Sequence, residues 1–140
     1  MNILIITQYF YPENFRINDF AIELRKKGHN ISVLTSIPNY PFGKYYTGYG
    51  LFSKRRSVHN KIKIYRCPVI PRRNGTAFWL SLNYLSYVFS GLLSSIFLLK
   101  NKIDLIYVYQ GSPITVAFPA IFIKKIKKIP ICISVVDLWP

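Results

Sequence analysis

Two short apolar runs, separated by a segment of helical length, constrain this chain more than any other feature. The run Ile3–Ile6 has no side chain suited to water, so it predicts a strand buried on both faces. The segment after it starts with Asn14, which can cap a helix, and stops at Gly28 after three basic residues. A second β-branched run lies at Asn30–Thr35. A strand, a crossover helix and a strand predict a right-handed unit of a doubly wound sheet.

The later part of the chain continues this alternation. An alternating Lys-Ile pattern predicts a half-exposed edge strand, and two apolar runs predict buried strands. Ser112 and Pro113 can open a helix as its cap and first-turn proline. We therefore expect an edge strand at Lys61–Arg66, a helix at 74–99, a strand at Asp104–Tyr109, a helix at Ile114–Lys125 and a strand at Pro130–Val136. The expected fold class is α/β, a Rossmann-like parallel sheet with flanking helices, in one domain over residues 1–140.

The charge of the chain is strongly positive and unevenly distributed. The net charge is +14, and no acidic residue lies between Glu23 and Asp104, where fourteen lysines and arginines do. Such a stretch attracts nucleic acid or an anionic membrane, or is simply a solvated basic surface. No nucleic-acid-binding module is recognisable, so we expect no nucleic acid partner. Cys67 and Cys132 have no metal-ligand spacing, and no signal peptide is visible, which favours a reduced cytoplasmic chain without a metal or cofactor.

Residues 74–99 form a run of 26 residues without a charge. That length is enough to span a bilayer. The run also contains a stripe of polar or small residues at helical spacing, and such a stripe lets a helix lie close to a sheet or to another helix. The stripe consists of Asn83, Ser86, Ser90 and Ser94. Two interpretations follow: a helix that is buried or lies against a membrane, and a transmembrane span.

Several polar residues follow the predicted strands directly. In open α/β sheets ligands bind beyond the carboxyl ends of the strands, so residues 8–14, 37–43 and 110–113 and Asp137 should meet at one edge. Glu13 and Asp137 lie where a general base or a hydroxyl acceptor would be placed, although a cap or turn role is equally open for each. His29 and His59 are expected at the surface.

Several motifs together resemble the N-terminal domain of a family 4 glycosyltransferase of the GT-B fold. They are Gln-Tyr-Phe-Tyr-Pro-Glu after the first strand, Arg-Lys-Lys-Gly-His at the helix end, the strand Ile31–Thr35, Pro-Asn-Tyr-Pro with Gly43, and Asp137-Leu138-Trp139-Pro140. The similarity is greatest to bacterial fucosamine-transferase-like enzymes of surface-polysaccharide assembly. The resemblance implies an acceptor-side domain, truncated at residue 140, without the C-terminal domain that binds the nucleotide-sugar donor. Such a chain is expected to be inactive alone.

The resemblance also implies a function and a set of site residues. The function is transfer of a sugar from a nucleotide-sugar to a lipid-linked or saccharide acceptor in O-antigen or capsule synthesis, peripherally on the inner face of the plasma membrane. Asp137 is the candidate catalytic residue. The expected acceptor-binding residues are Tyr11, Glu13, Asn14, Asn39, Tyr40, Gly43, Gln110 and Ser112. The expected membrane contacts are Lys54, Arg55, Arg56, Arg72, Arg73, Phe78 and Trp79. The alternative function is a membrane-anchoring or scaffolding subunit that uses the helix at 74–99 to recruit a separate catalytic chain.

Overall fold

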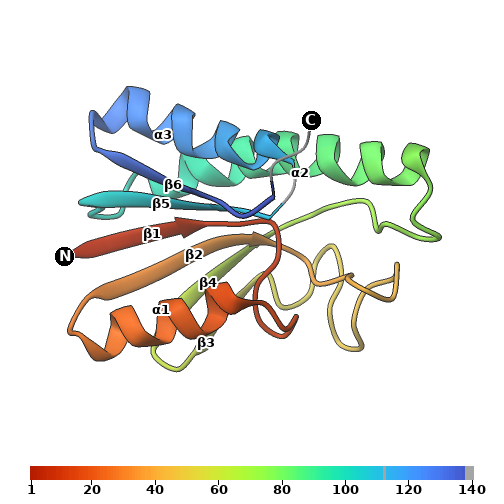
Figure 1. Ribbon diagram of the computed structural model, residues 1–140, viewed down its shortest axis with the longest axis horizontal. Helices are drawn as coiled ribbons and strands as arrows, with labels where there is room; N and C mark the ends of the chain where they lie inside the picture. Colours follow the sequence, from red (N-terminus) through yellow and green to blue (C-terminus); the bar gives the residue numbers. More distant parts are fainter. Residues whose placement is uncertain (112, 138–140) are drawn as a thin grey trace.

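The computed structural model describes residues 1–111 and 113–137, in which strands and helices alternate (Figure 1). In this part of the chain the strands are β1 (Asn2–Ile6), β2 (Asn30–Ser36), β3 (Arg56–His59), β4 (Ile62–Cys67), β5 (Leu105–Gln110) and β6 (Ile131–Val135). The helices are α1 (Arg16–Lys26), α2 (Ala77–Leu98) and α3 (Phe118–Lys127), and a short 3-10 helix, η1 (Ile114–Ala117), leads directly into α3. The strands form one sheet in the order β3-β4-β2-β1-β5-β6.

β1 lies inside the sheet, as the apolar run Ile3–Ile6 predicts. Its register pairs Ile5 with Val33 of β2 on one side and with Tyr107 of β5 on the other. Both pairings are parallel, as are those of β4 with β2 and of β6 with β5, whereas β3 is antiparallel to β4. The predicted α/β fold class, a Rossmann-like parallel sheet with flanking helices, is therefore confirmed.

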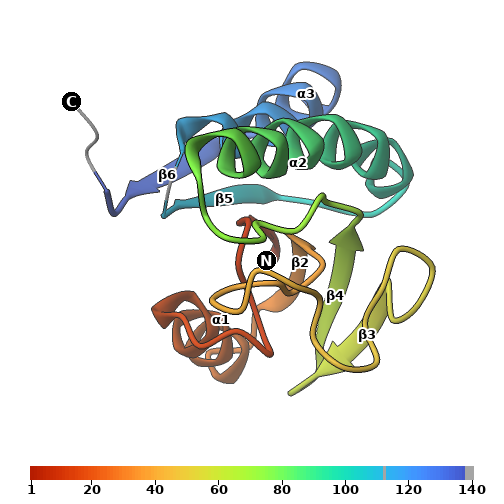
Figure 2. The same cartoon turned by 90° about the vertical axis from the view of Figure 1, so that its right-hand side faces the viewer.

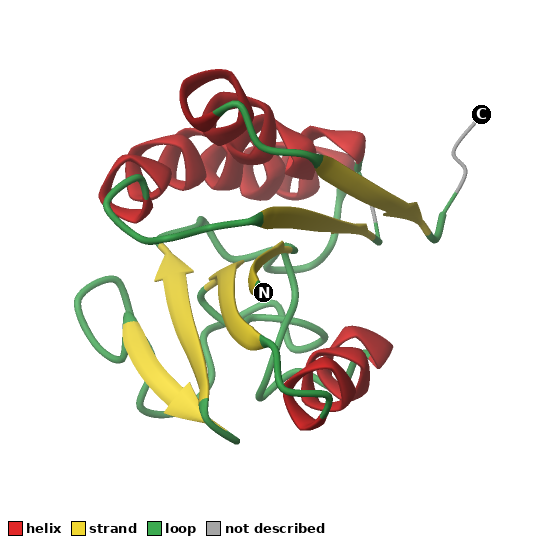
Figure 3. Ribbon diagram, turned by 90° about the vertical axis from the view of Figure 1, so that its left-hand side faces the viewer, coloured by secondary structure: helices red, strands yellow, loops and turns green. Residues whose placement is uncertain are grey.

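Helices cover both faces of the sheet, with α1 on one face and α2 and α3 on the other (Figures 1 and 3). Ile17 and Ala21 of α1 are fully buried in the first of two hydrophobic cores. The second core, on the opposite face, takes in Tyr87 and Leu98 of α2 and Ile123 of α3. Removal of this apolar surface from water holds the three layers together.

The start of α1 differs from the expected cap. The N-cap is Phe15, and Asn14 is exposed. A residue within the helix organises the loop instead: Asn18 accepts a hydrogen bond from the N–H of Tyr11 (3.1 Å) and donates one to the carbonyl of Glu13 (2.7 Å). The prediction of a cap at Asn14 was wrong. The side chain of Glu13 is buried and is hydrogen-bonded to the loop after β2, whereas the adjacent residue, Asn14, is exposed.

The alternating Lys-Ile strand is not an edge strand, because β4 lies between β2 and β3. The turn that joins β3 to β4 has Asn60 and Lys61 at positive φ, 49° and 61°, as a type I′ hairpin turn requires. Ile62 and Ile64 face the α1 core, whereas Lys63 on the opposite face is exposed, and this difference produces the alternation. β3 was missed because its short sequence contains a single large apolar residue.

The entry to α3 is longer than expected. Pro113 precedes η1 as its N-cap, and Pro119 takes the first-turn position of α3. The predicted cap, Ser112, lies outside the described residues. α3 ends at Lys127, because the next residue, the C-cap Lys128, has a left-handed backbone with φ 56°.

One polar side chain lies at the centre of the contact between α2 and the sheet. Asn83 is fully buried, accepts a hydrogen bond from Nε2 of Gln8 (2.6 Å) and donates one to the carbonyl of Ile70 (2.6 Å). Gly91 is buried on the same side, where a Cβ would lie 2.9 Å from Cγ of Pro119 on α3. α2 is thus held close to the sheet at Asn83 and to α3 at Gly91. Of the predicted stripe, Asn83 is fully buried, whereas Ser86, Ser90 and Ser94 are half-buried.

The long loop between β2 and β3 is held against the segment that precedes α2. The hydroxyl of Tyr45 donates to the carbonyl of Val69 (2.6 Å), and the N–H of Arg73 donates to the carbonyl of Gly43 (2.8 Å). Gly43 is buried with φ +68°, and a Cβ at this position would overlap the carbonyl oxygen of Arg73. Position 43 therefore requires glycine for its left-handed backbone and for the close approach of another segment.

We expect Gly43→Ala to lower the free energy of unfolding by about 2 to 4 kcal/mol, because a collision with Arg73 adds to the roughly 1 kcal/mol penalty of a left-handed alanine. Gly75→Ala is the matched control, since Gly75 has φ +73° and no atom within 4 Å of a Cβ. The control should lose only about 1 kcal/mol. Urea unfolding of both variants measures the difference. Equal losses would mean that the contact with Arg73 does not matter.

Candidate functional site

The loops after β1 and β2 meet at the carboxyl edge of the sheet, which faces the viewer in Figure 2. The side chain of Glu13 joins them. Its Oε1 atom accepts hydrogen bonds from the backbone N–H groups of Asn39 (2.9 Å) and Tyr40 (2.8 Å). The N–H of Glu13 itself donates to the carbonyl of Phe10 (3.0 Å). Glu13 therefore closes its own loop and holds the neighbouring one.

The carboxyl group of Glu13 has a perturbed environment. The residue is 1% exposed, and its Oε2 atom has no hydrogen-bond partner among the described residues. Burial raises the pKa of Glu13 to about 7, against the opposing effect of the backbone hydrogen bonds from Tyr40 and Asn39 and of the charge on Arg66. A carboxyl group that titrates near neutral pH can exchange a proton or accept a hydrogen bond from a hydroxyl group. Oε2 is itself buried, so no ligand reaches it in this structure.

Three aromatic rings and a guanidinium group lie at the same edge and form what we call the aromatic cluster, Tyr9, Phe15, Tyr40 and Arg72. Tyr9 stacks on Phe15 with 5.1 Å between ring centroids, and Tyr40 lies 5.6 Å from Tyr9. The guanidinium of Arg72 is 5.0 Å from the Tyr40 ring. Burial raises the pKa of Tyr9 far above its ordinary value, whereas Tyr40 is 39% exposed. The Tyr40 side chain is thus partly open to solvent, and the ring of a ligand could stack on it.

The other residues predicted in these two loops divide into two groups. Asn39 and Gly43 are buried and shape the backbone; the side chain of Asn39 donates to a carbonyl two residues away (2.9 Å). Tyr11 points toward the β3 hairpin and stacks on His59, with 3.6 Å between ring centroids. Asn14 is exposed outside the loop contacts. The predicted convergence therefore holds for Glu13, Asn39, Tyr40 and Gly43 and not for Tyr11 and Asn14.

The ends of β5 and β6 meet each other at this edge. The side chain of Gln110 donates from Nε2 to the backbone carbonyl of Asp137 (3.1 Å), and the backbone carbonyl of Gln110 accepts from the N–H of Val136 (3.0 Å). The Asp137 carboxylate is exposed and makes no hydrogen bond or ion pair within residues 1–111 and 113–137, so the structure offers no partner that would activate it. Ser112 lies outside the described residues. The same residues contain no group of three or more His, Cys, Asp or Glu side chains placed to hold a metal ion.

The face of α2 that points away from the sheet is apolar along its length. The helix contains no charged residue, and large side chains that are 49–75% exposed recur on this face. We call them the apolar stripe, Phe78, Leu85, Phe89, Leu93, Ile96 and Phe97. By length and composition alone α2 could cross a membrane, and the core helix of a soluble protein can have the same length and composition.

Basic residues border both ends of the apolar stripe. Arg73 precedes α2, and its guanidinium lies 3.8 Å from the ring centroid of Trp79. Trp79 in turn meets Phe78 edge-on at 5.4 Å, so three predicted membrane contacts lie together. Lys100 follows the other end of α2 and is exposed. Arg72, by contrast, belongs to the aromatic cluster and is only partly exposed.

The remaining basic residues predicted as membrane contacts lie next to β3. The Nζ atom of Lys54 is 5.0 Å from the ring centroid of Tyr49. Arg55 and Arg56 are exposed and line a cavity next to the last turns of α2. Arg55 and Arg56 are therefore near the end of the apolar stripe opposite to Arg73.

Two further residues support the site, and neither was among the predicted acceptor-binding residues. Arg66 is 2% exposed and donates to Oγ of Ser57 (2.7 Å) and to the carbonyl of Tyr11 (2.9 Å), which links β4 to the loop after β1. Tyr9 anchors the aromatic cluster. An arginine in a strand of alternating polar and apolar residues is expected to be exposed, so the local sequence pattern does not indicate that Arg66 is buried. Their place in the sequence is the one feature that could have indicated a role at the site, because both residues lie at or just after the carboxyl end of a parallel strand.

Comparison with known proteins supports the fold. No family model and no curated protein sequence matches this chain. A similar solved structure is the C-terminal domain of the PF1911 hydrogenase from Pyrococcus furiosus, with 14% sequence identity and a TM-score of 0.53. The match covers 96% of this chain and 90% of the hydrogenase domain. At this identity the likeness concerns the α/β architecture alone.

These findings correct the resemblance to family 4 glycosyltransferases. The similar solved structure is a hydrogenase domain rather than a glycosyltransferase, and no family model matches. The assignment to half of a GT-B enzyme of O-antigen or lipopolysaccharide synthesis was therefore wrong. It rested on loop motifs whose residues, Glu13 and Tyr40 among them, hold neighbouring loops of the sheet together. Such contacts are needed by the fold and do not identify a chemistry.

We expect the pH dependence of stability to change in Glu13→Gln. Because the pKa of the folded carboxyl, about 7, lies above its ordinary value of 4.5, the folded state keeps a proton that the unfolded state releases between these values. The free energy of unfolding of the wild type should thus fall by on the order of 3 kcal/mol as the pH rises from about 4.5 to about 7.

The variant has no carboxyl group to titrate at this position, so it should lack this fall, which urea unfolding at several pH values measures. Glu23→Gln is the control, since Glu23 is exposed on α1 and pairs only with Lys26. The control should keep the slope of the wild type. An unchanged slope in Glu13→Gln would contradict the assignment.

Proposed function

We propose that this chain is a peripheral membrane-docking domain whose apolar stripe and basic borders bind an anionic lipid surface. The observation that carries the proposal is the outer face of α2, where six large apolar side chains are exposed on a 22-residue helix without a charge. A helix at the surface of a soluble protein normally places charged residues toward water. A contiguous exposed apolar surface usually binds another molecule.

The distribution of charge favours a membrane as that molecule. The net charge is +14, with Arg73 and Lys100 at the two ends of α2. Basic groups attract anionic headgroups while neighbouring aromatic rings enter the interface. Phe78 and Trp79 lie next to Arg73 and fit that arrangement. The inner face of the plasma membrane carries the anionic lipids that such a surface would bind.

The inner face of α2 favours docking over spanning. Asn83 is hydrogen-bonded to Gln8, and the hydroxyl of Tyr87 donates to the carbonyl of Thr7 (3.4 Å). A spanning helix would have to break these contacts and uncover the core beneath it. We therefore propose that α2 lies flat on the membrane. Such a domain would serve as an anchor or scaffold that holds a separate catalytic chain at the surface.

We expect the purified chain to sediment with vesicles of phosphatidylcholine and phosphatidylglycerol, and less with phosphatidylcholine alone. Phe89→Ser should weaken partitioning about tenfold, because one phenyl ring that enters the interface contributes roughly 1.5 kcal/mol. Phe20→Ser is the control, since Phe20 is also exposed but lies on α1, on the opposite face of the sheet. Equal binding of wild type and Phe89→Ser would refute docking through the apolar stripe.

Extraction of membranes from cells that express the chain separates docking from spanning. A docked domain should be released by sodium carbonate, whereas resistance to carbonate would indicate that α2 spans the bilayer. Raising the salt concentration should weaken vesicle binding if the basic borders contribute.

We propose as a second function that the strand-end loops hold the sugar of a lipid-linked saccharide. One feature supports it: the partly exposed ring of Tyr40, which can stack on a sugar and whose backbone N–H is held by Glu13. Docking would place these loops near a lipid-anchored ligand. A nucleotide-sugar donor would need a separate domain or chain.

We expect saturation-transfer NMR to detect contact between the chain and a prenyl-diphosphate-linked N-acetylglucosamine in detergent micelles. Tyr40→Ala should weaken the sugar signals about tenfold, because stacking contributes roughly 1 to 1.5 kcal/mol. Phe42→Ala is the control, an exposed aromatic residue of the same loop outside the aromatic cluster. Equal signals from both variants would refute sugar binding by Tyr40.

A further inference from the structure

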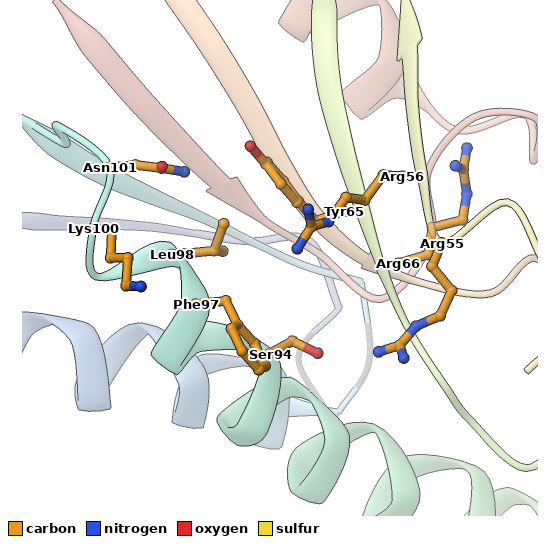
Figure 4. A pocket seen from close by; sticks show the side chains of 9 residues that line it. All are labelled: Arg55, Arg56, Tyr65, Arg66, Ser94, Phe97, Leu98, Lys100 and Asn101. Atoms are coloured by element: carbon orange, nitrogen blue, oxygen red, sulfur yellow. The ribbon is translucent and has the colours of Figure 1, made fainter. Parts of the chain in front are cut away.

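A cavity of about 460 Å³ lies between the last turns of α2 and the start of β3 with the end of β4 (Figure 4). It lies outside the strand-end loops and shares one lining residue, Phe97, with the apolar stripe. Its lining includes Arg55 and Arg56 from the β3 side and Ser94, Lys100 and Asn101 from α2 and the segment after it. Its volume is within the range of pockets that bind small molecules.

The lining of the cavity is positively charged, and no acidic side chain balances this charge. Arg55, Arg56 and Lys100 line it, and none of the five acidic residues of the chain does. In the described part of the chain, the side chains of these three basic residues make no hydrogen bond or ion pair. Charges of one sign in a hollow with protein walls concentrate the electrostatic field and attract counter-ions. An anion would relieve the repulsion between them.

A fourth basic residue lines the cavity with a different role. The guanidinium of Arg66 donates to Ser57 and to the carbonyls of Tyr11 and Lys54 (3.3 Å). These contacts hold the start of β3 against the end of β4. The backbone that carries Arg55 and Arg56 is thereby fixed, since the N–H of Arg66 also donates to the carbonyl of Arg55 (2.8 Å).

The other lining groups indicate which anion fits. Ser94 and Asn101 offer neutral hydrogen-bond donors, and the planar guanidinium groups of two arginines match the oxygens of a phosphate group. Leu98 and Phe97 supply an apolar wall for an organic substituent. Phe97 is 66% exposed and belongs to the apolar stripe, so the cavity opens next to the proposed membrane surface.

We propose that this cavity binds the phosphate of a small phosphorylated molecule, with Arg55, Arg56 and Lys100 as its cationic ligands. The same chemistry can come from a soluble phosphate compound or from the phosphomonoester headgroup of a lipid. The proposal does not depend on membrane docking, because a soluble ligand would bind the same three side chains.

The first experiment is titration of the purified chain with inorganic pyrophosphate, followed by calorimetry and by amide NMR shifts. We expect saturable binding and shifts that include Ser94 and Asn101. Arg56→Gln combined with Lys100→Gln should weaken binding at least about tenfold, because two charged hydrogen-bond donors are removed. The matched control is Arg16→Gln combined with Lys27→Gln, which removes one arginine and one lysine from exposed positions on or next to α1.

A second arm uses vesicles in which phosphatidic acid replaces phosphatidylglycerol. If pyrophosphate fails to bind and the chain prefers phosphatidic acid in a way that Arg56→Gln with Lys100→Gln abolishes, the cavity takes a lipid headgroup. If pyrophosphate binds to the wild type and the control alone, it takes a soluble phosphate compound. Equal loss in both double variants, shifts confined to other residues, or binding to neither probe would overturn the proposal.

Discussion

The position of α2 on the sheet is the constraint on which the other surfaces depend. Asn83 has its amide oxygen and nitrogen satisfied within the protein, by Gln8 and by the carbonyl of Ile70. A buried amide that lost either partner would keep an unsatisfied polar group, so the rotation of the helix is fixed. Gly91 fixes its distance from α3. Once the inner face is set, the apolar stripe must point outward, because a helix repeats every 3.6 residues.

The same placement creates the phosphate cavity. α2 crosses the sheet and leaves β3 and the exposed side of β4 uncovered near its last turns, as Figure 2 shows for β3 and β4 at the side opposite to β6. Arg55 and Arg56 approach this gap from β3, and Lys100 approaches from the end of the helix. At the carboxyl edge, Glu13 fixes the position of a neighbouring loop. Its buried carboxyl accepts hydrogen bonds from the backbone N–H groups of Asn39 and Tyr40.

Much of the fold could be predicted from the sequence, and less of the site. The apolar run of β1 and the uncharged run of α2 each determine a type of element, because burial must match local periodicity. The prediction of an edge strand at Lys61–Arg66 was wrong. Lys63 alternates with Ile62 and Ile64 because these isoleucines pack in the core with α1 while Lys63 is exposed on the other face, and only the tertiary structure decides where the helices lie. Glu13 was recognised as a strand-end carboxyl, but its contacts with Asn39 and Tyr40 join residues 26 and 27 positions away. No local pattern specifies such a pair.

By itself the sequence determined the alternation of the other strands with the helices, the parallel core of the sheet and the excess of positive charge, because composition and periodicity act within a few residues; it did not indicate β3. Only the tertiary structure decided which side of α2 is exposed, that Arg66 is buried while Arg55 and Arg56 share a cavity with Lys100, and that Tyr11 and Asn14 leave the site. These outcomes depend on contacts between distant segments. A charged or aromatic side chain acquires its role from the neighbours that packing provides.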